Sequence, residues 1–259
     1  MPVTVNIPSL GDKFQDYRDP IPGDSYNWGP AVKATDINYF TFHHSVTKQT
    51  AKDDGDWKKE CNYIANLHIT PEPNGRGWGG VGYRFIICSD GTVAYVGDLS
   101  HGGSAVADKN HIMFSACFVG DFTKENPTDA QITSAHKLAK HFLEAMPSYP
   151  NLNDWGDVKG HQEWNPTACP GTNWKKGGDS IYERIKNNIP YTPVPTPPPA
   201  PTPPPPIPAP TPPPPIPVPP PVSTPPVSNA QLKLNLIRDI VYGKGWPWTK
   251  INKIKTLLP

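Results

Sequence analysis

The chain has 259 residues, of which 36% are hydrophobic, and a formal net charge of +1 at pH 7. This balance gives no electrostatic reason to expect a nucleic-acid partner, and no apolar run is long enough to span a membrane. The length allows one substantial core, but 37 residues are prolines, far above the usual share of about 5%.

Alternating residues predict a strand at INYFTFHH (37–44). The two phenylalanines and His44 fall on one face of this strand, and His43 falls on the other. If the phenylalanine face packs in the core, His43 points away from it. The next segment, 57–69, places apolar residues at helical spacing and predicts an amphipathic helix.

Two further strands are predicted within 82–98, joined at Asp90-Gly91, which is one of the strongest short hairpin signals. A short apolar strand is predicted at 115–121. The segment 127–146 then starts with a capping box between a threonine and a glutamine and continues with a helical apolar stripe.

A last helix of this part of the chain is predicted at 180–188. Strands interspersed with helices predict an α/β domain with a central mixed sheet flanked by helices.

Most of the prolines lie between residues 190 and 227, where the unit APTPPPPIP occurs twice. Such a run favours polyproline II at about 3.1 Å per residue, so we expect a spacer. The alternative is a docking track for SH3-like or WW-like partners. The chain therefore divides into a first domain at 1–189, a proline-rich linker at 190–227 and a short C-terminal segment at 228–259.

The segment GHQEWNPTACPG (160–171) places a histidine and a cysteine eight positions apart. Its two prolines argue against a helix, so we expect a loop that can bring His161 and Cys169 to one point. His43, at the carboxyl end of its strand, is the third candidate ligand. Two histidines and a cysteine leave one position of a tetrahedral zinc ion open to water, which predicts hydrolysis of an acyl bond.

Three motifs carry a resemblance to a known family: His43-His44, RGWGGVGYRFIICSDG (76–91) and GHQEWNPTACPG. Together they resemble the type 2 N-acetylmuramoyl-L-alanine amidases, a family that includes phage endolysins and peptidoglycan recognition proteins. The similarity spans about residues 28–175. It implies a mixed sheet flanked by helices, with Zn2+ in a surface groove. It also implies bacterial peptidoglycan as partner, and cleavage between N-acetylmuramic acid and the L-alanine of the stem peptide.

The resemblance implies a role for each matching residue. His43, His161 and Cys169 match the family's zinc ligands. Tyr83 and Thr167 match catalytic positions at which a hydroxyl can stabilise developing negative charge. Softer matches imply substrate contacts at Trp78, His101 and Asn110.

A non-catalytic peptidoglycan-binding protein is the alternative function. Members that only bind commonly lose the cysteine ligand, and the presence of Cys169 therefore favours the enzyme. A zinc hydrolase that acts on another amide is a third hypothesis.

The remaining histidines and cysteines are expected to be structural. Three histidines fall on predicted helices: His68, His136 and His141. Three cysteines are expected to be buried thiols, with a disulfide between two of them as the alternative: Cys61, Cys88 and Cys117. Glu163 is expected to accept hydrogen bonds from backbone amides rather than to act as a general base.

The C-terminal segment 228–259 carries two apolar stripes, two tryptophans and several lysines. A basic amphipathic segment of this kind is expected to contact an anionic wall polymer or a membrane surface. The alternative is a helical hairpin that packs on the first domain or self-associates.

The first residues, MPVTVNIPSL, have neither the basic start nor the apolar stretch of a secretory signal. We therefore expect a protein that acts at the bacterial cell wall but stays cytoplasmic until phage lysis releases it, or that leaves by another route.

Overall fold

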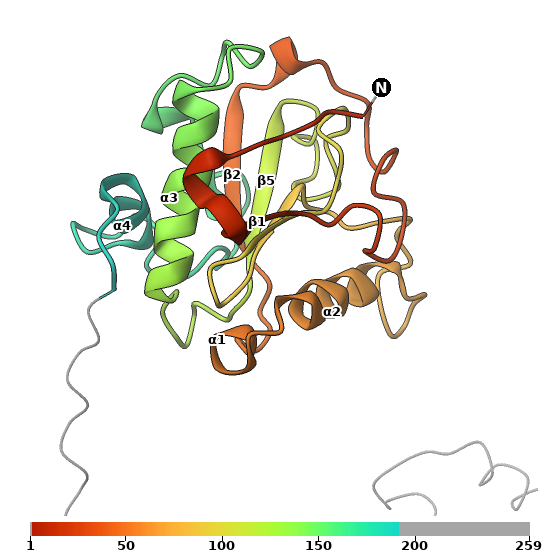
Figure 1. The fold of residues 1–259 in the computed structure, drawn as a ribbon, viewed down its shortest axis with the longest axis horizontal. Helices are drawn as coiled ribbons and strands as arrows, with labels where there is room; N and C mark the ends of the chain where they lie inside the picture. The colour runs from red at the N-terminus through yellow and green to blue at the C-terminus, as the bar shows by residue number, and fades with distance from the viewer. Residues whose placement is uncertain (1, 192–259) are drawn as a thin grey trace, which may run out of the picture. The chain divides into compact units, whose positions relative to one another are not determined.

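The computed structural model describes residues 2–191 (Figure 1). The predicted C-terminal segment and all but the first two residues of the predicted linker lie outside these residues. Within the described part, no helix combines the length and the apolar character that crossing a bilayer requires.

A six-stranded sheet lies at the centre of the fold, with the strand order β1-β4-β3-β5-β2-β6. The β3–β4 hairpin is antiparallel, and the other neighbouring pairs are parallel. The predicted α/β domain with a mixed central sheet is therefore confirmed. The strands are β1 (Phe14–Asp16), β2 (Tyr39–His44), β3 (Phe85–Ile87), β4 (Val93–Tyr95), β5 (Met113–Phe118) and β6 (Val158–Gly160).

Helices cover both faces of the sheet. Figure 1 shows α3 lying along the sheet with α4 beside it, and α2 at the other side with α1 next to it. The α-helices are α1 (Ala51–Asp54), α2 (Trp57–Ile69), α3 (Asp129–Glu144) and α4 (Ile181–Asn187). Short 3-10 turns occur at Pro8–Lys13, Ala34–Asp36, Trp155–Asp157 and His161–Glu163.

Strand parity divides the core in two. Phe40 and Phe42 of β2 are fully buried in the larger cluster, which also contains Phe142 of α3. Burying each such ring stabilises the fold by about 1.5 to 3 kcal/mol. The smaller cluster packs Cys61, Ile64 and Ala65 of α2 against Ile86 and Ala94 of the hairpin strands.

The same parity decides where the functional face lies. His43 pairs with Cys117, which pairs with Ile86, so these three residues belong to the face that α2 covers. Because α2 packs over β3 and β4, and β2 lies two strands away from β3, the carboxyl end of β2 stays beside the helix rather than under it.

Two local predictions are confirmed by hydrogen bonds. The capping box of α3 has the Gln131 N–H donating to Thr128 Oγ1 at 3.1 Å and the Thr128 N–H donating to Gln131 Oε1 at 3.0 Å. The hairpin turn is present at Asp90-Gly91, where Gly91 has φ of 85°. That left-handed conformation favours glycine.

Three expectations are corrected. The segment 160–171 is not wholly a loop, since β6 ends at Gly160 and a 3-10 turn follows. The strand expected at 115–121 runs instead over Met113–Phe118, and β1 is a strand that the sequence does not predict. The two missed strands have three residues each, too few to show an alternating pattern, and pairing with β2 and β4 holds them in the sheet.

Candidate metal centre

Three side chains from distant parts of the chain meet at one point. His43, His161 and Cys169 each offer a donor atom, and these atoms all lie within 4.8 Å of one another. Sγ of Cys169 lies 3.6 Å from Nδ1 of His43, and the ring centroids of the two histidines are 4.7 Å apart. The cluster expected from the sequence is therefore present.

The sheet places both histidines. His43 is near the carboxyl end of β2, and His161 directly follows β6, the parallel neighbour that pairs Gly160 with Phe42. Carboxyl ends of adjacent parallel strands lie at the same edge of a sheet, so the two imidazoles come together there.

Backbone hydrogen bonds bring the cysteine back to this edge. The Gln162 N–H donates to the Cys169 carbonyl at 2.8 Å, which closes the segment on itself. The His44 N–H donates to the Cys169 Sγ at 3.3 Å. A hydrogen bond donated to sulfur stabilises the thiolate, the form that binds metals.

Burial keeps the cluster neutral in the absence of a cation. It lowers the pKa of His43 well below the usual value, and the neighbouring His161 and His44 add to this effect. Burial also lowers the pKa of His161. It raises the pKa of Cys169 to about 12, partly offset by the amide of His44. A divalent cation bound here would instead stabilise the thiolate form of Cys169.

The residues present fit a zinc ion. Neutral imidazoles and a thiolate are the donors that zinc binds in catalytic His2Cys sites. Nε2 of His43 is buried and has no hydrogen-bond partner among residues 2–191. Hydrogen bonding within this part of the chain therefore does not account for the burial of this imidazole.

A groove with a volume of about 560 Å³ lies at the cluster. Its wall includes all three donors together with Trp78, Tyr83 and Thr167. His68 and Arg76 also line it. The predicted structural role of His68 is confirmed, because its Nδ1 accepts the Gly82 N–H at 3.3 Å. Helical spacing identifies the inward face of α2, but it does not show that this face ends at a groove.

Tyr83 lies directly beside the cluster. Its ring centroid is 5.2 Å from that of His43. Burial raises the pKa of Tyr83 well above its usual value, and the nearby thiols of Cys117 and Cys169 raise it further. The phenol therefore keeps its proton and remains a hydrogen-bond donor.

Thr167 is exposed at the rim of the groove. Its hydroxyl oxygen accepts the Cys169 N–H at 3.2 Å, which leaves the hydroxyl proton free to be donated elsewhere.

A comparison of the sequence with family models identifies the family of this chain. The family profile described as N-acetylmuramoyl-L-alanine amidase matches residues 33–172, which is more than half of the chain. The chain belongs to the N-acetylmuramoyl-L-alanine amidase family.

Named relatives of this amidase-family chain come from animals, phages and bacteria. Peptidoglycan-recognition protein SC2 of Drosophila melanogaster is 31% identical over 150 residues, which are 56% of this chain and 78% of that protein. The endolysin of Escherichia phage T7 is 32% identical over 103 residues, 39% of this chain and 66% of the endolysin. The solved structure of the amidase LysC from Clostridium intestinale is 27% identical with a TM-score of 0.43, covering 63% of this chain and 93% of that one.

Two predicted substrate contacts lie outside the residues that line the groove of the amidase domain. Asn110 Oδ1 accepts the N–H groups of Ala105 and Val106 at 2.8 and 3.0 Å. Asn110 thereby shapes the loop that contains Ser104 and Ala105, two residues that line the groove. His101 lies 3.1 Å from the Ser100 hydroxyl through its Nδ1. Direct substrate contact by Asn110 and His101 stays a prediction.

Other chemically active groups of the amidase domain have structural partners. Glu163 accepts hydrogen bonds from the Gly160 N–H and the Trp174 indole, both at 2.8 Å, and pairs with Lys175 at 2.9 Å. Cys61, Cys88 and Cys117 are buried and form no disulfide bond. The sulfur atoms of Cys61 and Cys88 lie 3.4 Å apart.

Proposed function

We propose that the protein is a zinc-dependent N-acetylmuramoyl-L-alanine amidase that acts at the bacterial cell wall. It cleaves the amide bond between N-acetylmuramic acid and the L-alanine of the stem peptide. One observation carries this proposal. In a chain of the amidase family, His43, His161 and Cys169 converge at a groove and form the donor set of a catalytic zinc site.

A zinc ion at these donors supplies a Lewis acid that polarises a carbonyl and lowers the pKa of a water molecule. The protein residues supply position and hydrogen bonds. Tyr83 keeps its proton and donates a hydrogen bond to the oxygen on which negative charge develops. Thr167, whose hydroxyl oxygen accepts the Cys169 N–H, offers its hydroxyl proton at the groove.

A non-catalytic peptidoglycan-binding protein is the rival function, and peptidoglycan-recognition proteins are among the relatives of this chain. The Cys169 thiol in the cluster favours the enzyme, because a site that only binds peptidoglycan has no need of a third metal donor. A hydrolase that acts on another amide shares the same zinc chemistry, so only the product distinguishes it.

Digestion of purified sacculi separates these functions. The zinc-loaded protein is incubated with sacculi, and new N-terminal residues are labelled and identified. Release of N-terminal alanine that stops after chelation and returns with added zinc supports the amidase. Binding to sacculi without new amines supports the recognition protein, and release of another amine supports a different hydrolase.

We also propose that the lysine-rich segment 228–259 attaches the enzyme to an anionic wall polymer or a membrane surface. Its support is the sequence pattern alone, because the segment lies outside the described residues. The proposed route to the wall is release from the cytoplasm by lysis, or another export route.

A further inference from the structure

A second hollow, with a volume of about 1100 Å³, opens beside the metal groove. We call it the outer hollow. Its walls come from residues 45–53, from the outward side of α2 and from residues 121–125. We propose that the outer hollow binds the glycan strand of peptidoglycan, on the sugar side of the bond that is cleaved. This inference rests on the proposed function and extends it to a part of the surface that holds no metal donor.

The outer hollow is continuous with the metal groove. Five residues line both: Ser45, Val46, Leu67, Asp121 and Lys124. These shared residues form a common boundary. A polymer bound at the zinc donors can therefore continue along the surface into the outer hollow.

Exposed apolar side chains gather in the outer hollow. Among residues 2–191, four large apolar side chains are exposed, and three of them line it: Val46 (60% exposed), Tyr63 (56%) and Leu67 (37%). Such a cluster of exposed apolar groups marks a binding surface. An aromatic ring such as that of Tyr63 offers a flat apolar face that a pyranose ring can cover.

The backbone is strained where the two hollows meet. Val46 has φ of 59°, a conformation that a β-branched residue rarely adopts. Hydrogen bonds hold it there: the Val46 N–H donates to the Gly120 carbonyl, and the Ser45 N–H donates to the Phe118 carbonyl, both at 2.9 Å. Strained backbone of this kind persists only where the surrounding structure imposes it, and it is found most often at ligand sites.

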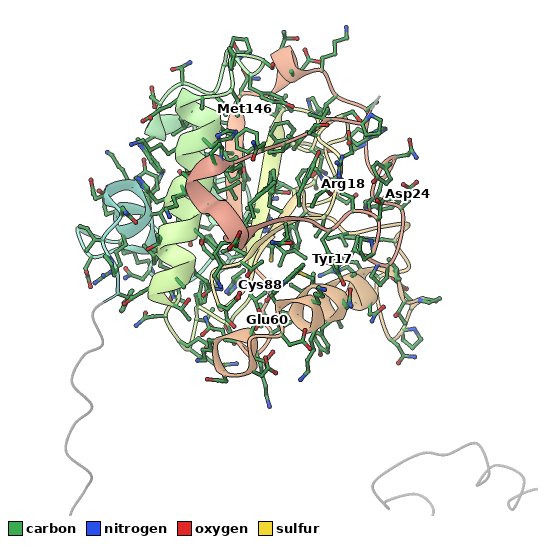
Figure 2. The ribbon with its side chains drawn as sticks, viewed as in Figure 1. Tyr17, Arg18, Asp24, Glu60, Cys88 and Met146 are labelled. Carbon is green, nitrogen blue, oxygen red and sulfur yellow. The ribbon has the colours of Figure 1, made fainter. Side chains whose placement is uncertain are left out.

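Glu60 of α2 fixes the segment around Thr50 and Ala51, which forms part of the wall of the outer hollow, to this helix. Its buried carboxylate accepts the Thr50 N–H at 2.6 Å and the Ala51 N–H at 2.9 Å. It also accepts the N–H and hydroxyl of Ser89 at 2.9 and 2.7 Å. Figure 2 shows Glu60 at the end of α2 that faces α1. A wall held in this way is already formed before a ligand arrives, which lowers the entropy cost of binding.

The charges favour a neutral polymer in the outer hollow. Four lysines and four carboxylates line it, so their formal charges cancel. Lys124 pairs with Asp121 at 2.7 Å, and Glu60 is occupied by its amide and hydroxyl donors. Sugar rings with hydroxyl and acetamide groups suit such a surface.

The charge differs where Arg76 and Trp78 line the groove. Leu67 also borders a third hollow, of about 470 Å³, which is lined by Arg76 and Trp78. In the described part of the chain, no carboxylate lies within ion-pair distance of Arg76. A free guanidinium suits the carboxylates of a stem peptide. The charges thus direct the peptide toward Arg76 and the glycan toward the outer hollow.

Tyr63 provides the test. Binding of a neutral peptide-free chain, β-1,4-linked N-acetylglucosamine, is measured by calorimetry for the full chain and for Tyr63→Ala and Tyr63→Phe. This probe carries no lactyl carboxylates. Asn66→Ala is the matched control, because Asn66 is exposed on the same helix but lines none of the three hollows. We expect Tyr63→Ala to weaken binding by about three- to tenfold. We expect Tyr63→Phe and Asn66→Ala to bind like the unchanged protein.

A kinetic comparison gives a second readout. The ratio of kcat/KM on peptide-bearing glycan chains to kcat/KM on a one-sugar muramoyl peptide should fall in Tyr63→Ala by a similar factor. Equal binding of peptide-free chains by Tyr63→Ala and the unchanged protein overturns the inference, as does the absence of any binding by the unchanged protein. Weaker binding by Tyr63→Ala of free stem peptide, but not of glycan, also overturns it. Failure of the sacculus digest alone contradicts the proposed function and leaves the glycan-binding result standing.

Discussion

Burial holds the Cys169 side chain as a neutral thiol until a cation arrives beside it. The pKa of this thiol is raised to about 12, while the pKa values of His43 and His161 are lowered. The imidazoles are therefore ready to bind a metal at neutral pH, and the thiol would become a ligand if the proposed zinc ion displaced its proton. Metal binding at this site is expected to release a proton.

Replacement of Cys169 tests this assignment. Cys169→Ala removes the thiolate ligand and should abolish turnover and greatly weaken zinc binding, as measured by zinc titration and by release of N-terminal alanine. Cys61→Ala is the control, because it removes a buried thiol from the core beside α2 and leaves the donor set intact. Near-normal turnover by Cys169→Ala would rule out the site.

His68 makes stability depend on pH. Burial, and then the charge of Arg76, lower its pKa to about 4. Between pH 6.5 and 4 the unfolded chain binds a proton at His68 that the folded protein does not, so the free energy of unfolding falls as pH falls through this window. The loss amounts to about 3 kcal/mol.

Urea unfolding at pH 7.5 and pH 4, with chelator present, checks this expectation. The difference in unfolding free energy between the two pH values should be larger for the unchanged protein than for His68→Gln, which has no titrating group there. An identical difference in both proteins would contradict the depressed pKa of His68.

At the scale of single residues, the sequence predicts the direction of a side chain well where the pattern of its neighbours along the chain determines that direction. The alternation of β2 sends Phe40 and Phe42 to the core, and His43 then has to face the other side. His68 has the structural role expected of it, since its Nδ1 accepts the Gly82 N–H at 3.3 Å. Its position beside Trp78 and Tyr83 could not be predicted, because these two residues come from a different segment. Asn110 holds a loop through its side-chain oxygen, a role that the sequence did not indicate, and its predicted substrate contact stays a prediction.

Among the structural elements, those with a strong local signal follow from the sequence, including the short hairpin strands β3 and β4, and the short strands without such a signal depend on tertiary pairing. The capping box of α3 and the apolar spacing of α2 identify both helices in advance. The strands β1 and β6 have three residues each, and only their pairing with β4 and β2 makes them strands. The pairing of β6 has a functional consequence, because it delivers His161 to the edge where His43 lies.

The loop between His101 and β5 depends on one side chain. Asn110→Ala leaves the N–H groups of Ala105 and Val106 without their acceptor and should cost about 1 to 3 kcal/mol of stability. Asn110→Asp keeps an acceptor oxygen at this position and should remain close to the unchanged protein. Thermal unfolding of both variants checks this, and equal losses in the two would show that the acceptor is not what matters.

For the molecule as a whole, residues 2–191 contain the six-stranded sheet, the donor cluster and the three hollows. The predicted division at 190–227 and 228–259 stays a prediction, because those segments lie outside the described residues almost entirely. Figure 2 shows Tyr17 and Cys88 beside α2, and both belong to the core cluster that this helix packs against, which anchors the helix within the first domain.

Deletion of residues 228–259 should therefore leave hydrolysis of a soluble muropeptide intact, while adsorption to whole cell walls declines. Initial rates on muropeptide and cosedimentation with walls measure the two effects separately. Loss of the soluble reaction in the deleted protein would mean that the segment belongs to the catalytic fold.

X-ray absorption spectroscopy of the zinc-loaded protein tests the central claim most directly. We predict one bound zinc ion per chain, with one sulfur neighbour at about 2.3 Å and two imidazole nitrogens at about 2.0 to 2.1 Å. The sulfur should be absent from the spectrum of Cys169→Ala. A zinc shell without sulfur, in a protein that still releases N-terminal alanine from sacculi, would contradict the account.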